Sequence, residues 1–173
     1  GVRRFSSLVY PHKPGMAAWL NQWAVSFARQ TPDCLATATF YPEPEAAGYV
    51  ADAIAAGTEV FKAHVQVGNY DPNDPLLDEV WALIEDAAVP VVIHCGSGPV
   101  PGDFTGPQRI ERLLRRHPRL VLIVAHMGMP EYSEFLDLAE EFDQVWLDTT
   151  MAFTPFVEST MPFPPADTQR LHA

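Results

Sequence analysis

Apolar and polar positions along the chain follow two rhythms, one typical of β-strands and one typical of helices. Short runs rich in β-branched, leucine and aromatic residues predict strands. These runs cover residues 2–10, 34–41, 59–67, 89–96, 120–128 and 144–150. Between them, apolar residues three or four positions apart predict helices at residues 15–30, 45–57, 74–87, 106–117 and 130–142. Strand and helix therefore alternate along the chain.

The junctions between these elements carry residues that commonly begin or end helices. Asp74 precedes Pro75, as an N-cap residue precedes a proline in the first helical turn. Gly57 follows one predicted helix, and Pro118 follows the helix that ends at His117. These residues support the boundaries drawn from the hydrophobic pattern.

The predicted strands are almost continuously apolar, which is typical of a parallel sheet covered by helices. An open doubly wound sheet and a (β/α)8 barrel both have this arrangement. A barrel needs eight strands and usually about 250 residues, whereas this sequence has 173 residues and fewer strands. The pattern is therefore compatible with two folds, a self-contained sheet and the middle part of a longer barrel.

Composition narrows the classes of partner. Acidic residues outnumber basic ones by 22 to 11, which gives a net charge of −11, and 47% of residues are hydrophobic. Such a charge disfavours nucleic acids and anionic membrane surfaces. We expect a globular protein whose partner is a small molecule or another subunit.

Cysteine usage and hydropathy bear on location. Cys34 and Cys95 are the only cysteines, and both lie in apolar strand-like runs, which disfavours a disulfide framework or a cysteine-based zinc site. No apolar stretch approaches the roughly eighteen residues of a membrane helix, and the start "GVRRFSSLVY" lacks the apolar region of a secretory signal. We expect a cytoplasmic protein.

Two predicted strands end on histidine. "VPVVIHCG" ends at His94 and "LVLIVAHMG" ends at His126, each just before small or glycine residues. The carboxyl ends of parallel strands are where α/β folds build their sites, and imidazole suits both divalent metals and acid–base chemistry. A single histidine there is more often a hydrogen-bonded core residue, but two at matching positions favour a site.

The strand before His94 adds three polar side chains, in "FKAHVQVG". Lys62, His64 and Gln66 alternate and are expected to share one face of the strand. A buried lysine is costly unless it is paired, so Lys62 and His64 are candidate substrate-binding residues. The alternative, a solvated strand near a sheet edge, is equally open.

Three more positions are candidates with ordinary alternatives. Asp148 ends the last strand, where it can orient a catalytic histidine or simply cap a turn. His12, beside Lys13 in a proline-bounded loop, can contact a substrate anion or be an ordinary loop residue. Cys95 directly follows His94, points to the opposite side of the strand and is expected to pack.

Other catalytic signatures are absent from the sequence. It has no P-loop, no Gly-x-Gly-x-x-Gly after a strand, no nucleophile elbow and no His-Glu-x-x-His. Nucleotide-binding and serine-hydrolase functions are therefore disfavoured.

The segment "FKAHVQVGNYDPNDPLLDEVWALIEDAAVPVVIHCGSG", followed by "LVLIVAHMG", resembles the amidohydrolase-related family of metal-dependent TIM-barrel hydrolases and decarboxylases. The resemblance implies a divalent metal, most often zinc, with His94 as a metal ligand and His126 as the general acid–base residue. It also implies that the visible strands are the second to the seventh. We therefore expect one TIM-barrel-type α/β domain over residues 1–173, incomplete because the first and last barrel strands are missing.

The sequence also departs from the family pattern. The family's first strand carries a His-x-His metal pair and its eighth strand an aspartate, and neither motif occurs here. Catalytic zinc generally takes three protein ligands, whereas His94 and His126 supply two at most. Lys62 lies before its strand end, which favours a mononuclear over a binuclear centre.

We accordingly predict a metal-dependent hydrolase that acts on a small, anionic substrate through a metal-activated water. The alternatives are a non-oxidative decarboxylase on the same scaffold and an inactive barrel fragment that serves as a binding or assembly module. A homo-oligomer stays open, because the apolar segment 151–165 suits a subunit contact as well as a loop over the substrate.

Overall fold

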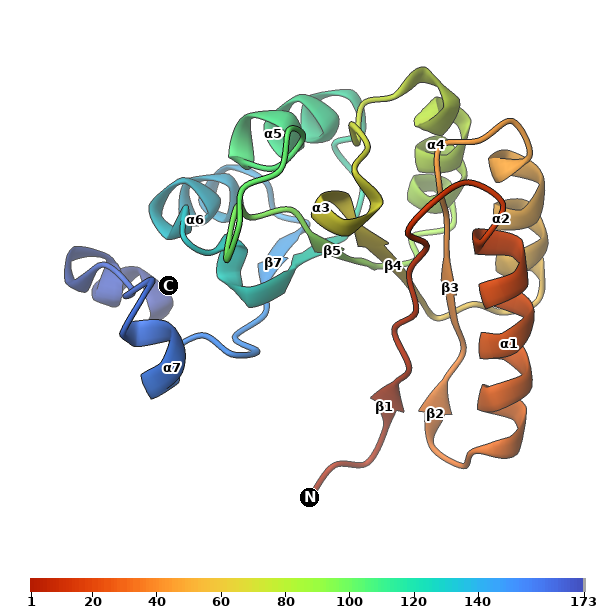
Figure 1. The fold of residues 1–173 in the computed structure, drawn as a ribbon, viewed down its shortest axis with the longest axis horizontal. Coiled ribbons are helices and arrows are strands. Elements are labelled where there is room, and N and C mark those ends of the chain that lie inside the picture. Colours follow the sequence, from red (N-terminus) through yellow and green to blue (C-terminus); the bar gives the residue numbers. More distant parts are fainter. Residues whose placement is uncertain (173) are drawn as a thin grey trace.

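The computed structural model describes residues 1–172 as a parallel α/β structure (Figure 1). Strands β3 to β7 form one five-stranded sheet in sequence order, while β1 pairs with β2. All strand pairs are parallel, so the carboxyl ends of β3 to β7 lie along one edge. The strands are β1 (Phe5–Ser6), β2 (Cys34–Leu35), β3 (Thr37–Thr39), β4 (Val60–His64), β5 (Val91–His94), β6 (Leu122–Val124) and β7 (Val145–Leu147).

The five longer α-helices lie in an arc outside the strands, whereas the short helix α3 lies inside this arc (Figure 1). The α-helices are α1 (Ala17–Gln30), α2 (Ala46–Ala55), α3 (Val65–Gly68), α4 (Asp78–Asp86), α5 (Pro107–Arg116), α6 (Tyr132–Glu141) and α7 (Pro155–Glu158). The 3-10 helices are η1 (Pro75–Leu77), η2 (Ala125–Gly128) and η3 (Pro165–His172). The five predicted helices are confirmed as α1, α2, α4, α5 and α6, and the arrangement is a partial TIM-type barrel. Within residues 1–172, no helix is long and apolar enough to cross a membrane.

The predicted strands are all present but shorter than expected, and one prediction about their faces is wrong. β4 ends at His64, and the chain turns at once into α3 because the His64 side chain caps it. Gln66 is therefore helical and not in phase with Lys62 and His64. Its side-chain amide instead donates to the carbonyl of Val100.

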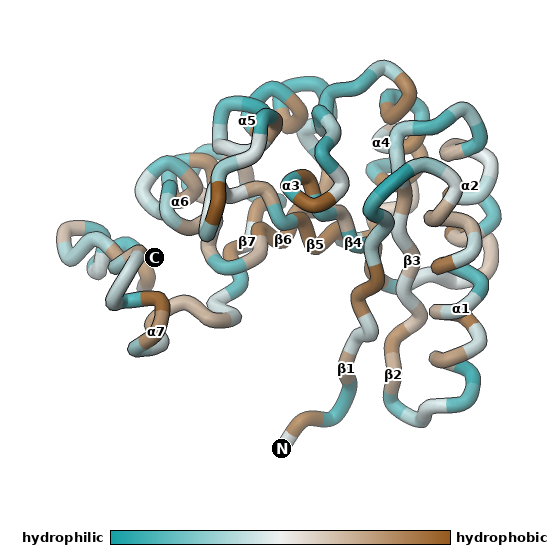
Figure 2. The backbone as a smooth tube through the Cα atoms, in the orientation of Figure 1, coloured by the Kyte–Doolittle hydropathy of each residue, from teal (hydrophilic) through white to brown (hydrophobic). Residues whose placement is uncertain are grey.

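The main core lies between the sheet and the helices, and strands β5 to β7 are largely hydrophobic (Figure 2). Phe40 meets Trp81 edge to face at 4.9 Å between ring centroids and lies 6.2 Å from Phe61. The Trp81 indole N–H donates to the Pro72 carbonyl at 2.8 Å, so no buried donor is lost there. This packing joins α4 to β4 and to the segment that follows β3.

The apolar segment 151–165 forms a second, smaller cluster next to η2 and α6. The Tyr132 hydroxyl donates to the Met161 carbonyl at 3.1 Å, and its ring contacts Phe163. The segment is thus partly buried against its own chain, although Phe156 in α7 is 70% exposed. The buried members of this cluster are Met127, Met129, Tyr132, Leu136, Ala152, Val157 and Phe163.

Candidate active site

Three histidines come together at the carboxyl ends of β4, β5 and β6. Strand register places His64 beside His94, and their rings stack at 4.1 Å with an interplanar angle of 13°. The His126 ring meets His94 edge-on, at 5.2 Å and 72°. The structure thus brings together three of the four histidines that the sequence predicted as site residues, and His12 is the fourth.

An aromatic side chain extends the stack toward solvent. Tyr10, which follows β1, lies 4.6 Å from the His64 ring and 5.6 Å from the His12 ring. His12 is exposed at the outer end of this row. Sequence reasoning missed Tyr10, although its place at the end of an apolar run beside His12 was the available signal.

The backbone at His126 has an unusual conformation. His126 and Met127 have φ values of 56° and 54°, in the left-handed region that non-glycine residues rarely adopt. Gly128 continues the turn with φ of 70°, and a side chain there would meet the Phe135 ring. A Cβ on Gly96 would lie 2.5 Å from the Gly128 carbonyl oxygen. The loops after β5 and β6 therefore touch backbone to backbone, and the strained turn directs His126 into the site.

Backbone carbonyls determine which ring nitrogens carry protons. His94 Nε2 lies 3.3 Å from the Gly98 carbonyl oxygen, and His126 Nδ1 lies 2.8 Å from that of Thr150. A carbonyl only accepts hydrogen bonds, so these nitrogens carry the proton in the neutral rings. The lone pairs are left on His94 Nδ1 and His126 Nε2. The site thus presents two unprotonated ring nitrogens, from residues at the ends of adjacent strands.

Burial keeps the inner histidines uncharged. The pKa of His64 is lowered to about 3, mainly because the ring is desolvated and to a smaller extent because His94 is close. The pKa of His94 is lowered to about 4, again mainly by desolvation and to a smaller extent by the nearby His126. Both rings are therefore neutral near pH 7, which is the form that acts as a ligand or a base.

Lys62 lies beneath the histidines and is almost fully buried, with 7% of its surface exposed. β4 lies between β3 and β5, so the alternative of a solvated strand near a sheet edge is wrong. Desolvation lowers the pKa of Lys62 to about 8, and the charge of Asp148 opposes this shift. Within residues 1–172 its ammonium group forms no direct ion pair, which leaves a buried positive charge open to an anion.

Asp148 follows β7 and has a clear structural role. Its Oδ1 accepts a hydrogen bond from the Thr150 backbone N–H at 2.6 Å, so the predicted turn-capping alternative is confirmed. Its backbone carbonyl also accepts from Met127 N–H at 2.9 Å, which ties η2 to β7. A catalytic role for Asp148 stays a prediction. Cys95 is buried as expected, and burial raises the pKa of its thiol.

The described residues do not by themselves fit a complete metal centre. Within residues 1–172, no group of three or more His, Cys, Asp or Glu side chains is placed to hold one ion. Imidazole lone pairs lie in the ring plane, so the parallel His64 and His94 rings cannot both point at one ion. His94 and His126 can supply two ligands, whereas catalytic zinc generally takes three from the protein.

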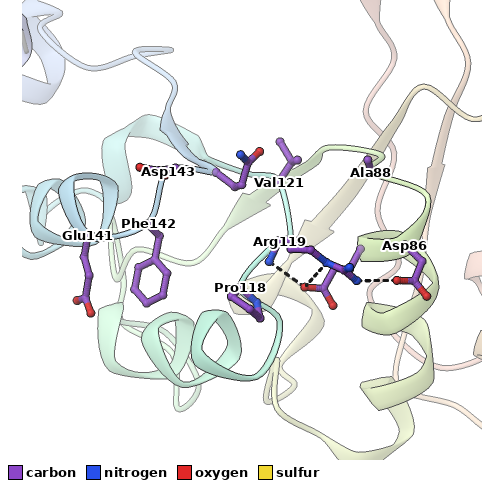
Figure 3. Close-up of a pocket in the computed structure, with 10 residues that line it drawn as sticks. Asp86, Ala88, Pro118, Arg119, Val121, Glu141, Phe142 and Asp143 are labelled. Atoms are coloured by element: carbon purple, nitrogen blue, oxygen red, sulfur yellow. Dashed lines mark hydrogen bonds and ion pairs between the residues drawn. The ribbon is translucent and has the colours of Figure 1, made fainter.

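A surface hollow lies at the other edge of the sheet, just before β5, β6 and β7 begin (Figure 3). It measures about 680 Å³ and contains Arg119, which pairs with Asp86 at 2.7 Å and approaches Glu85 at 3.8 Å. His117, the last residue of the predicted helix 106–117, is buried, and its Nδ1 lies 3.2 Å from a carboxylate oxygen of Glu85. These charges pair with one another, so the candidate site is the histidine cluster at the opposite edge.

A parallel sheet, an outer arc of helices and chemistry at the strand ends define a TIM-barrel type of protein. A family model described as amidohydrolase matches residues 7–170. The chain belongs to the amidohydrolase family. No match was found among curated proteins.

Solved structures share this fold. An uncharacterized TIM-barrel protein from Bordetella bronchiseptica is 21% identical, with a TM-score of 0.67 over 80% of this chain and 54% of its own. Dihydroorotase from Campylobacter jejuni is 12% identical, with a TM-score of 0.59 over 88% and 50%. Manganese-bound 5-carboxyvanillate decarboxylase from Novosphingobium aromaticivorans is 16% identical, with a TM-score of 0.55 over 85% and 57%. The chain thus spans little more than half the length of these proteins.

Proposed function

We propose that this protein is a hydrolase of the amidohydrolase family that acts on a small, anionic substrate. The observation that carries the proposal is the pair of free imidazole lone pairs, on His94 and His126, beside the buried ammonium group of Lys62. Active sites typically place acid–base groups next to a buried charge that has no partner in the protein. Here that charge is positive, which suits an anionic substrate.

In this proposal each residue has a distinct task. Lys62 binds the anionic group of the substrate and His12 contacts it at the rim. His126 Nε2 accepts a proton from the attacking water and passes it to the leaving group as the scissile bond breaks. The charge of Asp148 helps to keep Lys62 protonated.

We propose that His94 is a ligand of a zinc ion. When bound, zinc would activate water and polarise the scissile group. Because residues 1–172 supply at most two ligands, no step above is derived through the metal. Manganese in the Novosphingobium decarboxylase supports a divalent ion in general.

Decarboxylation is the second candidate, and the similarity to 5-carboxyvanillate decarboxylase favours it. In this reaction the C–C bond that joins the carboxylate group to the rest of the substrate breaks, and CO2 leaves. Protonated His126 then delivers a proton to the substrate carbon that carried the carboxylate. Release of CO2 from a carboxylic acid substrate would distinguish this reaction from hydrolysis. A non-catalytic binding or assembly module is the third candidate.

A small-molecule substrate and a cytoplasmic location complete the proposal. The net charge of −11 supports a partner that is neither nucleic acid nor membrane. Two free cysteines support a reducing compartment. A homo-oligomer stays open.

The first test is metal content by plasma mass spectrometry, for the intact protein, His94→Ala and the control His117→Gln. We expect about one divalent ion per chain in the wild type and the control, and none in His94→Ala. His117 lies at the other edge of the sheet, so it controls for general loss of histidine. No metal in the wild type would overturn the metal-dependent function and favour the binding module.

A further inference from the structure

We infer that Lys62 and His64 together form a carboxylate-binding site at the end of β4, in which Lys62 supplies the charge and His64 Nε2–H supplies a directed hydrogen bond. This inference rests on the proposed function, because it names the chemical class of the anion. It adds a role for His64 that depends on which ring nitrogen carries its proton.

The hydrogen bond between the His64 ring and the backbone of α3 determines which ring nitrogen carries the proton. The backbone N–H of Val67 lies 3.3 Å from His64 Nδ1 and donates to it. A backbone N–H can only donate, so Nδ1 must hold a lone pair. The proton of the imidazole is therefore on Nε2, and His64 is a hydrogen-bond donor toward any ligand.

The ring that carries this donor is held in place from both sides. His94 stacks on the His64 ring at 4.1 Å, and Tyr10 lies against it at 4.6 Å. Among the described residues, Nε2 has no hydrogen-bond partner and is not buried away from solvent. The His64 ring is thus held with a donor that is unused among the described residues and accessible to solvent.

Lys62 supplies the charge two residues earlier on the same strand, so both side chains project from the same face of β4. The lysine is 93% buried and has no direct anionic partner within residues 1–172. One ammonium group and one N–H match the two oxygens and single charge of a carboxylate. The nearby negative Asp148 disfavours a doubly charged phosphate.

The tautomer can be tested directly on the wild-type protein. Imidazole 15N spectra of uniformly labelled protein should show His64 protonated at Nε2 and unprotonated at Nδ1. Protonation at Nδ1 would overturn the inference, because the ring would then present a lone pair to the ligand.

Benzoate is the probe for the anion, and its affinity is measured by isothermal titration at pH 7. We expect Lys62→Met to weaken binding by more than tenfold and His64→Phe, which keeps a stacked ring but loses the donor, by about tenfold. His64→Gln keeps an N–H donor and should recover part of this loss. Arg29→Met removes a distant exposed charge and should bind benzoate like the wild type.

Unchanged benzoate affinity in both Lys62→Met and His64→Phe would overturn the site. Inorganic phosphate that binds more tightly than benzoate would also overturn the assignment to carboxylates. The measurement needs neither metal nor turnover, so it separates this inference from the proposed function. If the wild type binds benzoate but plasma mass spectrometry finds no metal in it, the carboxylate site stands and only the metal-dependent function is overturned.

Discussion

At the scale of single residues, burial decides the chemistry of Lys62. Its ammonium group is desolvated, and only part of that cost is offset by the charge of Asp148. A protein keeps such a costly group where a ligand uses it, and this is the stability–function conflict typical of binding sites. The conflict makes the role of Lys62 measurable without a known substrate.

We expect Lys62→Met to stabilise the free protein. The pKa of Lys62 falls from 10.5 to about 8, which corresponds to roughly 3 kcal/mol as an upper figure for the cost of the buried charge. The free energy of unfolding from urea titrations at pH 7 should rise by about 1–3 kcal/mol. A destabilised variant would mean that the charge is well compensated in the folded state.

The same shift predicts a pH dependence. Below about pH 8 the lysine is charged in both states, and the cost is fully present. Between about pH 8 and pH 10.5 only the unfolded chain holds the proton, so the wild type gains stability relative to Lys62→Met as pH rises. Parallel urea titrations across this window should show the gap closing. A constant gap would contradict the lowered pKa.

At the scale of elements, the turn from β6 into η2 is the tightest part of the site. Gly128 has a positive φ and faces the Phe135 ring, and a Cβ at this position would lie only 2.0 Å from a carbon of that ring. No small adjustment of a packed helix relieves such an overlap. The turn that carries His126 therefore depends on this glycine.

Gly128→Ala should lower the free energy of unfolding by about 2–4 kcal/mol, because it adds both overlap and backbone strain. The matched control is Gly48→Ala in α2, where a methyl group meets nothing within 4 Å. That change should raise stability by about 0.5–1 kcal/mol. Urea unfolding of both variants gives the comparison, and equal effects would contradict the tight turn.

At the scale of the whole molecule, β7 is the last strand of the five-stranded sheet and pairs only with β6 among the described residues. Trp146 in β7 is 62% exposed, although the chain as a whole is strongly acidic. An unpaired strand edge with an exposed aromatic residue favours association with other strands. This edge is the expected origin of any aggregation.

Trp146→Lys should reduce light scattering at high protein concentration while it changes the free energy of unfolding by less than about 0.5 kcal/mol. A lysine on an edge strand opposes pairing with another edge, and the exposed tryptophan contributes little to the core. The α1 variant Trp19→Lys, similarly exposed at 59%, is the control. Equal loss of scattering in both variants would point to general surface hydrophobicity.

Much of the fold followed from local patterns. Alternating apolar runs predicted the helices, the strands and the parallel sheet, because hydrophobic periodicity reflects which face of each element is buried. The histidines at the ends of two strands were visible for the same reason. The strand lengths were not, since His64 ends β4 by capping α3 with its side chain.

The sequence by itself determined the residue types available at the strand ends, the acidic balance and the order of the elements. Only the tertiary structure decided how these residues act. The proton positions of His94 and His126 depend on carbonyls of Gly98 and Thr150, which reach the rings through loops. The exposure of Lys62 depends on neighbouring strands from distant parts of the sequence. Tautomers and desolvation are set by contacts in space, which sequence periodicity does not contain.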